Sequence, residues 1–273
     1  MKHIITCVSI LALATTGRAM QSASENLLAK VDHLVYATPD LELGIQAMEK
    51  LSGVRASAGG QHPGLGTRNA LIALGPSTYL EIIGPDPAQP KPAGPLRFGI
   101  DQLQAPRLLT WVAKGTELAP FVHRARANGV LLGDVISGSR RRPDGVLLSW
   151  RYTDPNVVLE DRLVPYFIDW GTSPHPAMTA APGLSLRALR AEHPEPERVA
   201  RMLRQLGLDL PVRRGARPSL IATIDTPKGR IELRNQRRWI SPCQRIGAKL
   251  DLHGLRTIAL SPFEMEHRPR AVG

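Results

Sequence analysis

Apolar residues follow two different periods along the first part of the chain. Residues 31–37 are apolar at most positions, with the spacing of a strand, whereas 39–51 has its apolar residues at i, i+4 and i+7. Thr38 supplies an N-cap hydroxyl before the second segment, and Gly53 supplies a residue suited to end a helix. The chain is therefore expected to open with a strand followed by a helix.

A glycine-rich segment and a hairpin complete this first unit. Residues 59–69, with glycines at 59, 60, 64 and 66, form either a strand or a loop. They lack the Lys-Ser/Thr ending of a phosphate-binding loop, so we do not interpret them as a nucleotide site. Strands at 70–74 and 78–83 are expected to pair around the turn Gly75-Pro76-Ser77.

The same order of elements recurs twice. Gly53, Gly129 and Gly207 each follow a predicted helix and lie 76 and 78 residues apart. The later units contain predicted helices at 117–128 and 195–206 and predicted strands at 107–113, 146–152, 164–168, 184–189, 219–225 and 230–234. This repetition indicates internal duplication in an α+β fold, because each small unit leaves a sheet face bare until another unit covers it.

These patterns divide the chain into four parts. Residues 1–26 are a signal-like or disordered segment, 27–180 a domain of two units, 181–234 a third related unit, and 235–273 a basic extension without the repeat. The first part has the basic start and apolar run of a secretory signal, but the run is too short for a stable membrane anchor. We expect a cytoplasmic protein, or a periplasmic or secreted one if that segment is cleaved.

Composition narrows the classes of partner. The formal net charge is +11, and more than half of it lies at the two ends of the chain. The mildly basic middle favours an anionic small molecule, or is simply a solvated arginine-rich surface. Aromatic residues make up only 4% and are not interleaved with basic ones, so nucleic acid is not expected as a partner. The two cysteines, Cys7 and Cys243, exclude a disulfide framework.

Two polar side chains among apolar strand residues are the first candidates for chemistry. His33 lies in the strand 31–37, on the face opposite Asp32 by strict alternation, and Glu81 lies in the strand 78–83. A lone strand histidine is often a hydrogen-bonded core residue, but a buried carboxylate must be paired, hydrogen-bonded or metal-bound. Together the two residues predict a metal site on a sheet.

Five further residues are candidates for the same site. His62 and His175 each adjoin a proline, and each either lines the pocket or belongs to a surface turn. Asn69 and Tyr79 are candidate substrate-binding groups. A run of three arginines centred on Arg141 either decorates an exposed turn or binds a substrate carboxylate or phosphate.

Four stretches of the sequence carry a family resemblance: Val31–Leu41, Gly59–Leu71, Tyr79–Glu81 and Phe167–Pro176. Together they resemble the glyoxalase-like domain proteins of the vicinal oxygen chelate superfamily, over about residues 30–234. The resemblance implies βαβββ modules whose curled mixed sheets surround a central cleft with a divalent metal. It also implies that two substrate oxygens bind this metal, Zn, Mn, Fe or Ni, which acts as a Lewis acid.

The resemblance implies a ligand set that this chain supplies only in part. The first strand of a module gives a His and the last strand a Glu, which match His33 and Glu81. The first-strand positions of the second and third units are Leu109 and Ala188, which cannot bind a metal, whereas the second unit has Asp169 in its last strand. Either a loop histidine completes the set, or the pocket is metal-free.

Two functions remain open. The first is a metal-dependent lyase, isomerase or dioxygenase acting on a small oxygen-rich molecule, with Glu81 and Asp169 as catalytic groups and His62 or His175 as third ligand or proton carrier. The second is a non-catalytic protein that sequesters a small molecule in the same cleft. The odd third unit either completes a barrel within the chain or pairs across a homodimer.

Overall fold

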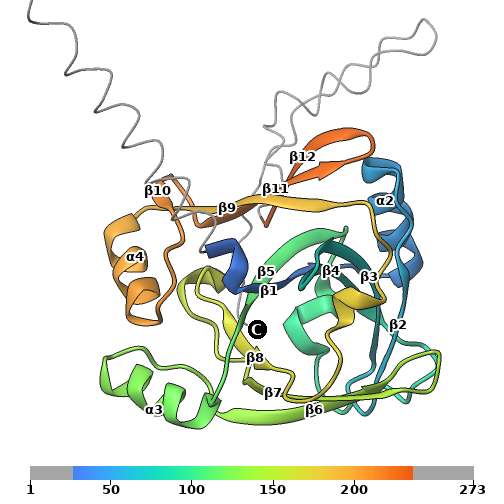
Figure 1. Cartoon of the computed structure of the whole chain (residues 1–273), viewed down its shortest axis with the longest axis horizontal. Helices are drawn as coiled ribbons and strands as arrows, with labels where there is room; N and C mark the ends of the chain where they lie inside the picture. Colours follow the sequence, from blue (N-terminus) through green and yellow to red (C-terminus); the bar gives the residue numbers. More distant parts are fainter. Residues whose placement is uncertain (1–26, 236–273) are drawn as a thin grey trace, which may run out of the picture. The chain divides into compact units, whose positions relative to one another are not determined.

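The computed structural model describes residues 27–235 (Figure 1). The predicted signal-like segment, 1–26, and the extension from residue 236 onward lie outside these residues. The described part is a mixed α+β structure whose larger sheet is curled and nearly closed, as the sequence predicted. None of its helices has the length and apolar character needed to cross a membrane.

The order of elements agrees with three units of one strand, one helix and three strands. The first unit comprises β1 (Val31–Ala37), α2 (Leu41–Ser52), β2 (Ser57–His62), β3 (Thr67–Gly75) and β4 (Thr78–Pro85). The second comprises β5 (Arg107–Lys114), α3 (Leu118–Ala127), β6 (Val135–Arg141), β7 (Leu147–Thr153) and β8 (Tyr166–Asp169). The third comprises β9 (Ser185–His193), α4 (Pro196–Gln205), β10 (Val212–Arg214), β11 (Ser219–Thr226) and β12 (Gly229–Arg234). Three short 3₁₀ helices, η1 (Arg97–Gln102), η2 (Glu160–Arg162) and η3 (Pro176–Met178), lie in the connections.

The first helix shows how local sequence sets these boundaries. Its N-cap is Asp40, whose side chain accepts a hydrogen bond from the Leu43 amide, and the predicted cap Thr38 instead donates to the Asp40 carbonyl. The helix ends at Gly53, which has φ 82°. This left-handed conformation strains a residue with a Cβ but suits glycine, which explains why the helix stops there.

The first two units form one eight-stranded sheet, sheet A. Its order is β2-β3-β4-β1-β5-β8-β7-β6. Strands β1 and β5 pair antiparallel at the centre, while β4 lies parallel to β1 and β8 parallel to β5. The two units therefore share a strand order and meet along β1 and β5.

The curl of sheet A brings its two edge strands, β2 and β6, together (Figure 1). Between these two strands the described chain has no backbone ladder. Instead, the Arg140 guanidinium on β6 donates to the Gly59 carbonyl on β2. A Cβ at Gly60 would lie 2.6 Å from the Arg141 carbonyl oxygen, so only glycine permits this approach. We call this junction the seam.

The third unit forms a separate sheet, sheet B, with the order β10-β9-β11-β12. Its strand pairing differs from that of the first two units, because β9 pairs antiparallel with β11, whereas β1 pairs parallel with β4. One apolar cluster joins the two sheets, and it includes Leu34, Trp111, Leu189 and Ala222. Sheet B thereby covers the outer face of the centre of sheet A, which keeps both faces of β1 away from water.

The chain after β8 returns across the first unit. The Ala73 amide donates to the Ala181 carbonyl at 2.8 Å, and Ala177 and Ala180 pack against Leu71 and Tyr79. This segment, 170–181, therefore lies over β3 and β4 at one end of the cleft.

Candidate active site

An irregularity in β1 places the side chains of two neighbouring polar residues on the same face of the sheet. Opposite β5, Val31 pairs with Ala113 and His33 pairs with Val112, so Asp32 is an extra residue on β1. Such a β-bulge interrupts the alternation of faces. The prediction that His33 and Asp32 point to opposite faces is therefore wrong, because it assumed a regular strand.

Asp32 holds three ring groups, of which His33 and Trp170 line the cleft. Its carboxylate is only 1% exposed, and it lies 2.7 Å from Nδ1 of His33 and 3.2 Å from Nε2 of His175. The Trp170 indole donates to it at 3.1 Å. Burial alone would raise the pKa of Asp32, but the hydrogen bonds to His175 and His33 outweigh it and hold that pKa at about 2. Asp32 is therefore a carboxylate that fixes the orientation of both imidazoles.

This bond determines which nitrogen of His33 faces the cleft. Because Nδ1 donates to Asp32, the neutral ring keeps its lone pair on Nε2. The ring stacks on Tyr79, with centroids 4.6 Å apart and planes inclined by 18°. Nε2 lies 3.4 Å from the Tyr166 hydroxyl and 3.8 Å from Oε2 of Glu81. The two residues predicted as a pair thus face each other.

Glu81 and His62 form the other side of the group. The Asn69 amide donates to Oε1 of Glu81 at 2.6 Å, and the same amide lies 3.3 Å from Nε2 of His62. Nδ1 of His62 lies 2.9 Å from the Thr67 hydroxyl. Burial lowers the pKa of His62 to about 4, against a smaller opposing effect of Glu81. His62 is therefore neutral at neutral pH, as a metal-binding histidine must be.

Aromatic rings and two arginines enclose the rest of the cleft. The space between these groups measures about 50 Å³ and is partly open to solvent. Arg97 comes from η1 and lies over the Tyr152 ring at 5.3 Å, and Arg140 enters from β6. The aromatic lining residues are Tyr79, Phe98, Trp150, Tyr152, Tyr166 and Trp170. The site is therefore lined largely by aromatic rings and has one carboxylate facing two guanidinium groups.

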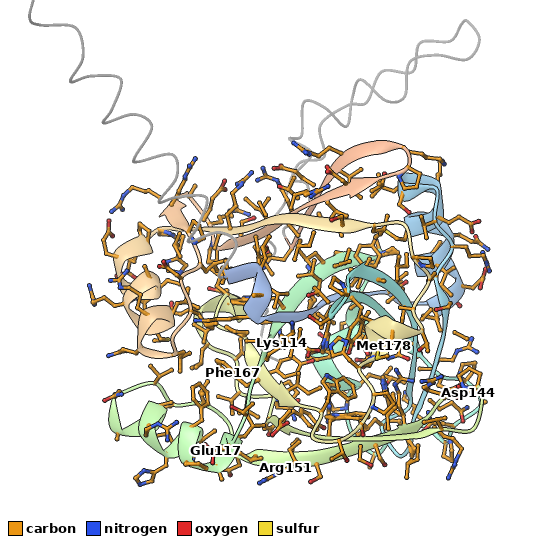
Figure 2. The ribbon with its side chains drawn as sticks, viewed as in Figure 1. Lys114, Glu117, Asp144, Arg151, Phe167 and Met178 are labelled. Carbon is orange, nitrogen blue, oxygen red and sulfur yellow. The ribbon has the colours of Figure 1, made fainter. Side chains whose placement is uncertain are left out.

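The three consecutive arginines have three different environments. Arg140 is 3% exposed and lines the cleft. Arg141, the predicted substrate-binding residue, is exposed on the other face of β6 and donates to the Gly145 carbonyl. Arg142 pairs with Asp144 in the β6–β7 turn, where Figure 2 labels Asp144. The exposed-turn interpretation thus fits the second and third arginines but not the first.

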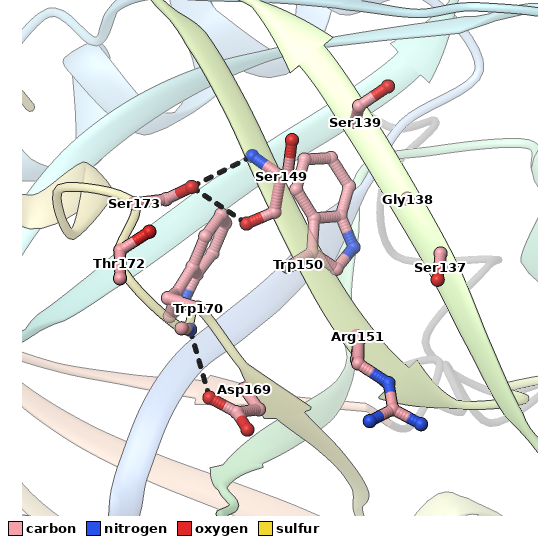
Figure 3. Close-up of a pocket in the computed structure, with 11 residues that line it drawn as sticks. Ser137, Gly138, Ser139, Ser149, Trp150, Arg151, Asp169, Trp170, Thr172 and Ser173 are labelled. Carbon is pink, nitrogen blue, oxygen red and sulfur yellow. Dashed lines mark hydrogen bonds between the residues drawn. The ribbon is translucent and has the colours of Figure 1, made fainter.

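Asp169, a predicted catalytic residue, lines a neighbouring groove that shares Trp150 and Trp170 with the cleft (Figure 3). Its Oδ1 accepts a hydrogen bond from the Gly171 amide at 2.9 Å. The groove measures about 480 Å³ and is bordered by hydroxyl groups from Ser137, Ser139, Ser149, Thr172 and Ser173. Alternation along β8 directs Tyr166 and Ile168 into the cleft and Asp169 away from it.

Sequence reasoning assigned no role to Asp32, which supports His33, or to the lining residues Arg97 and Tyr166, and it named Arg140 only as a member of the arginine run. For Arg140 the sequence holds a usable pattern, because Ile136, Gly138 and Arg140 alternate with the exposed residues of β6. For Asp32 the direction of the side chain depends on the β-bulge, and no pattern in the sequence marks that bulge.

The donor types in the cleft fit a divalent metal. Nε2 of His33 and Nε2 of His62 each lie 3.8 Å from an oxygen of Glu81, which is too long for a hydrogen bond. Bonds of about 2.1 Å to one ion would span such a distance. In the described part of the chain, no three His, Cys, Asp or Glu side chains already stand in the full arrangement of a metal site. The third donor, His62, is instead engaged with Asn69.

Comparison with solved structures found similar chains. A hypothetical protein from Staphylococcus aureus is 14% identical, with a TM-score of 0.50 over 75% of this chain and 84% of that one. Methylmalonyl-CoA epimerase from Mycobacterium tuberculosis is 16% identical, with a TM-score of 0.36 over 52% of this chain and 88% of that one. At 14% identity, the likeness to the Staphylococcus aureus protein concerns the fold alone.

Comparison with families is more decisive. No curated protein matches the sequence. The family model described as a glyoxalase-like domain matches residues 31–207, which covers the first two units and β9 with α4. This match confirms the resemblance seen in the sequence, and the chain belongs to the glyoxalase-like domain family.

Proposed function

We propose that this protein is an enzyme that acts on a small oxygen-bearing molecule between His33 and Glu81. The observation that carries the proposal is the Asp32–His33 hydrogen bond, which leaves Nε2 of His33 facing Glu81 across 3.8 Å. A carboxylate behind a histidine is the usual support of a metal-binding imidazole. The same arrangement is hard to explain as packing, because it buries two carboxylates and two imidazoles together.

In this proposal His33 and Glu81 hold a divalent metal, with His62 as the third protein ligand. The metal would polarise substrate oxygens as a Lewis acid. Asp32 keeps the lone pair of His33 on the correct nitrogen, and Asn69 orients the Glu81 carboxylate. The aromatic lining reduces contact with water, which strengthens every electrostatic interaction within the cleft.

The first experiment measures metal content of the purified full chain by elemental analysis. We expect about one divalent ion per chain in the wild type and its loss in His33→Ala and in Glu81→Gln. His123→Ala is the matched control, because this histidine is exposed on α3, away from the cleft. Equal metal content in His33→Ala and His123→Ala would contradict the proposed ligand set.

A sequestering protein remains the alternative to an enzyme. The space of about 50 Å³ favours the enzyme, because a cleft that sequesters a whole drug-sized molecule needs roughly 300–1,000 Å³. Turnover decides between them: an enzyme consumes an oxo or hydroxy compound catalytically, whereas a sequestering protein binds it in a fixed ratio and releases it unchanged.

A further inference from the structure

Arg140 has an unusual combination of burial and free hydrogen-bonding capacity. Its side chain lines the cleft and the residue is 3% exposed. Among the described residues it makes one hydrogen bond, to the Gly59 carbonyl, and no ion pair. A guanidinium has five N–H donors. No nitrogen of Arg140 is among the described side-chain atoms that are fully buried and lack a hydrogen-bond partner. Its other donors therefore face the cavity.

Arg140 has no ion pair among the described residues, although it lies in a cavity that holds charged groups. The lining contains two guanidinium groups, Arg140 and Arg97, and one carboxylate, Glu81. The second carboxylate of the site, Asp32, is bonded to His33, His175 and Trp170 instead. Burial lowers the pKa of Arg140, and nearby Tyr79 and Glu81 oppose this effect. An arginine nevertheless stays charged in a protein. A buried, unpaired charge is costly, so this cavity is suited to an anion.

The size of the cavity limits that anion. About 50 Å³ admits a group of a few heavy atoms next to Arg140, and Arg97 reaches the same space from η1. A planar carboxylate matches the forked geometry of a guanidinium and needs less room than a tetrahedral phosphate ester. The geometry therefore favours a carboxylate over a phosphate ester as the group that binds beside the two arginines.

We propose that the substrate is a small 2-hydroxy or 2-oxo carboxylic acid whose carboxylate pairs with Arg140 and Arg97. The oxygen on its second carbon then faces His33 and Glu81, and this part of the inference rests on the proposed function. The carboxylate contact itself does not depend on a metal. Arg140 is thus a residue that determines substrate specificity, in addition to its contact at the seam.

The test measures binding in the absence of metal, so that it can fail independently of the proposed function. The full chain, treated with EDTA, is titrated with lactate and with lactamide, its neutral isostere, and the fluorescence of Trp150 and Trp170 at the cleft reports occupancy. We expect lactate to bind at least tenfold more tightly than lactamide. We also expect Arg140→Gln to weaken lactate binding at least tenfold.

Two variants make the result specific. Arg141→Gln removes an arginine from the outer face of the same strand and should leave lactate binding unchanged. If Arg140→Gln melts early because the Gly59 contact is lost, Arg97→Gln replaces it, since this residue lines the cleft from outside the seam.

Four outcomes would overturn the inference: no lactate binding by the wild type, equal binding of lactate and lactamide, unchanged lactate binding in a folded cleft-arginine variant, or tighter binding of inorganic phosphate. If the purified chain contains no divalent metal before EDTA treatment and still binds lactate as expected, the metal is removed from the proposed function and the carboxylate contact stands.

Discussion

The two halves of sheet A have the same strand order but line the cleft with different chemistry. The first unit supplies Asp32, His33, His62 and Glu81. The second supplies aromatic rings and Arg140, with Leu109 in its first strand where the first unit has a histidine. The two halves share a strand order, but one lines the cleft with imidazole and carboxylate groups and the other lines it mainly with aromatic rings and one guanidinium group.

The largest expected effect comes from the buried acid of the first unit. Asp32→Ala leaves two imidazoles and the Trp170 indole without their acceptor, and we expect a loss of about 3 to 5 kcal/mol in the free energy of unfolding. Asp169→Ala is the counterpart in the second unit, where only one turn hydrogen bond is lost, at a cost of at most about 1 kcal/mol. Urea titration of both variants measures the difference, and equal losses would contradict this difference between the two halves.

The buried imidazole of His62 in the first unit should make the free energy of unfolding fall at acidic pH. The pKa of His62 is about 4 in the folded chain and 6.5 for an ordinary histidine, so below pH 6.5 the unfolded chain binds more protons. Stability should therefore fall between pH 6.5 and pH 4, by about 3 kcal/mol from this residue. His62→Gln should remove that part of the fall. A variant with the wild-type dependence would show that His62 titrates normally.

A smaller effect is expected where glycine supports Glu81. A Cβ at Gly59 would lie 2.1 Å from Oδ1 of Asn69, the residue that orients Glu81. Gly59→Ala should cost about 1 to 3 kcal/mol and weaken metal retention. Gly75→Ala is the control, because nothing lies within 4 Å of the added methyl group. Thermal unfolding of the two variants compares them, and a Gly59→Ala protein as stable as the control would count against this contact.

Local sequence determined the elements that depend on neighbouring residues. The bounds of β1 agree with the predicted strand at 31–37, and α2 ends where Gly53 was expected to stop it. Strand β6 was missed, because its exposed face carries serines and arginines and its inner face includes Gly138. A strand at the seam is stabilised by contacts that form only when the whole sheet curls. A short segment of sequence carries no sign of these contacts.

For the site, the sequence by itself determined that His33 and Glu81 lie on neighbouring strands of one sheet, because strand periodicity and the repeated unit place them there. Tertiary structure alone decided the rest. The bulge at Asp32 directs the side chains of two adjacent residues to the same face of the sheet. The return of 170–181 brings His175 to Asp32, and the closure of sheet A directs Arg140 into the cleft. Each depends on contacts between residues far apart in the chain, whose energies are set by burial and close packing rather than by local propensity.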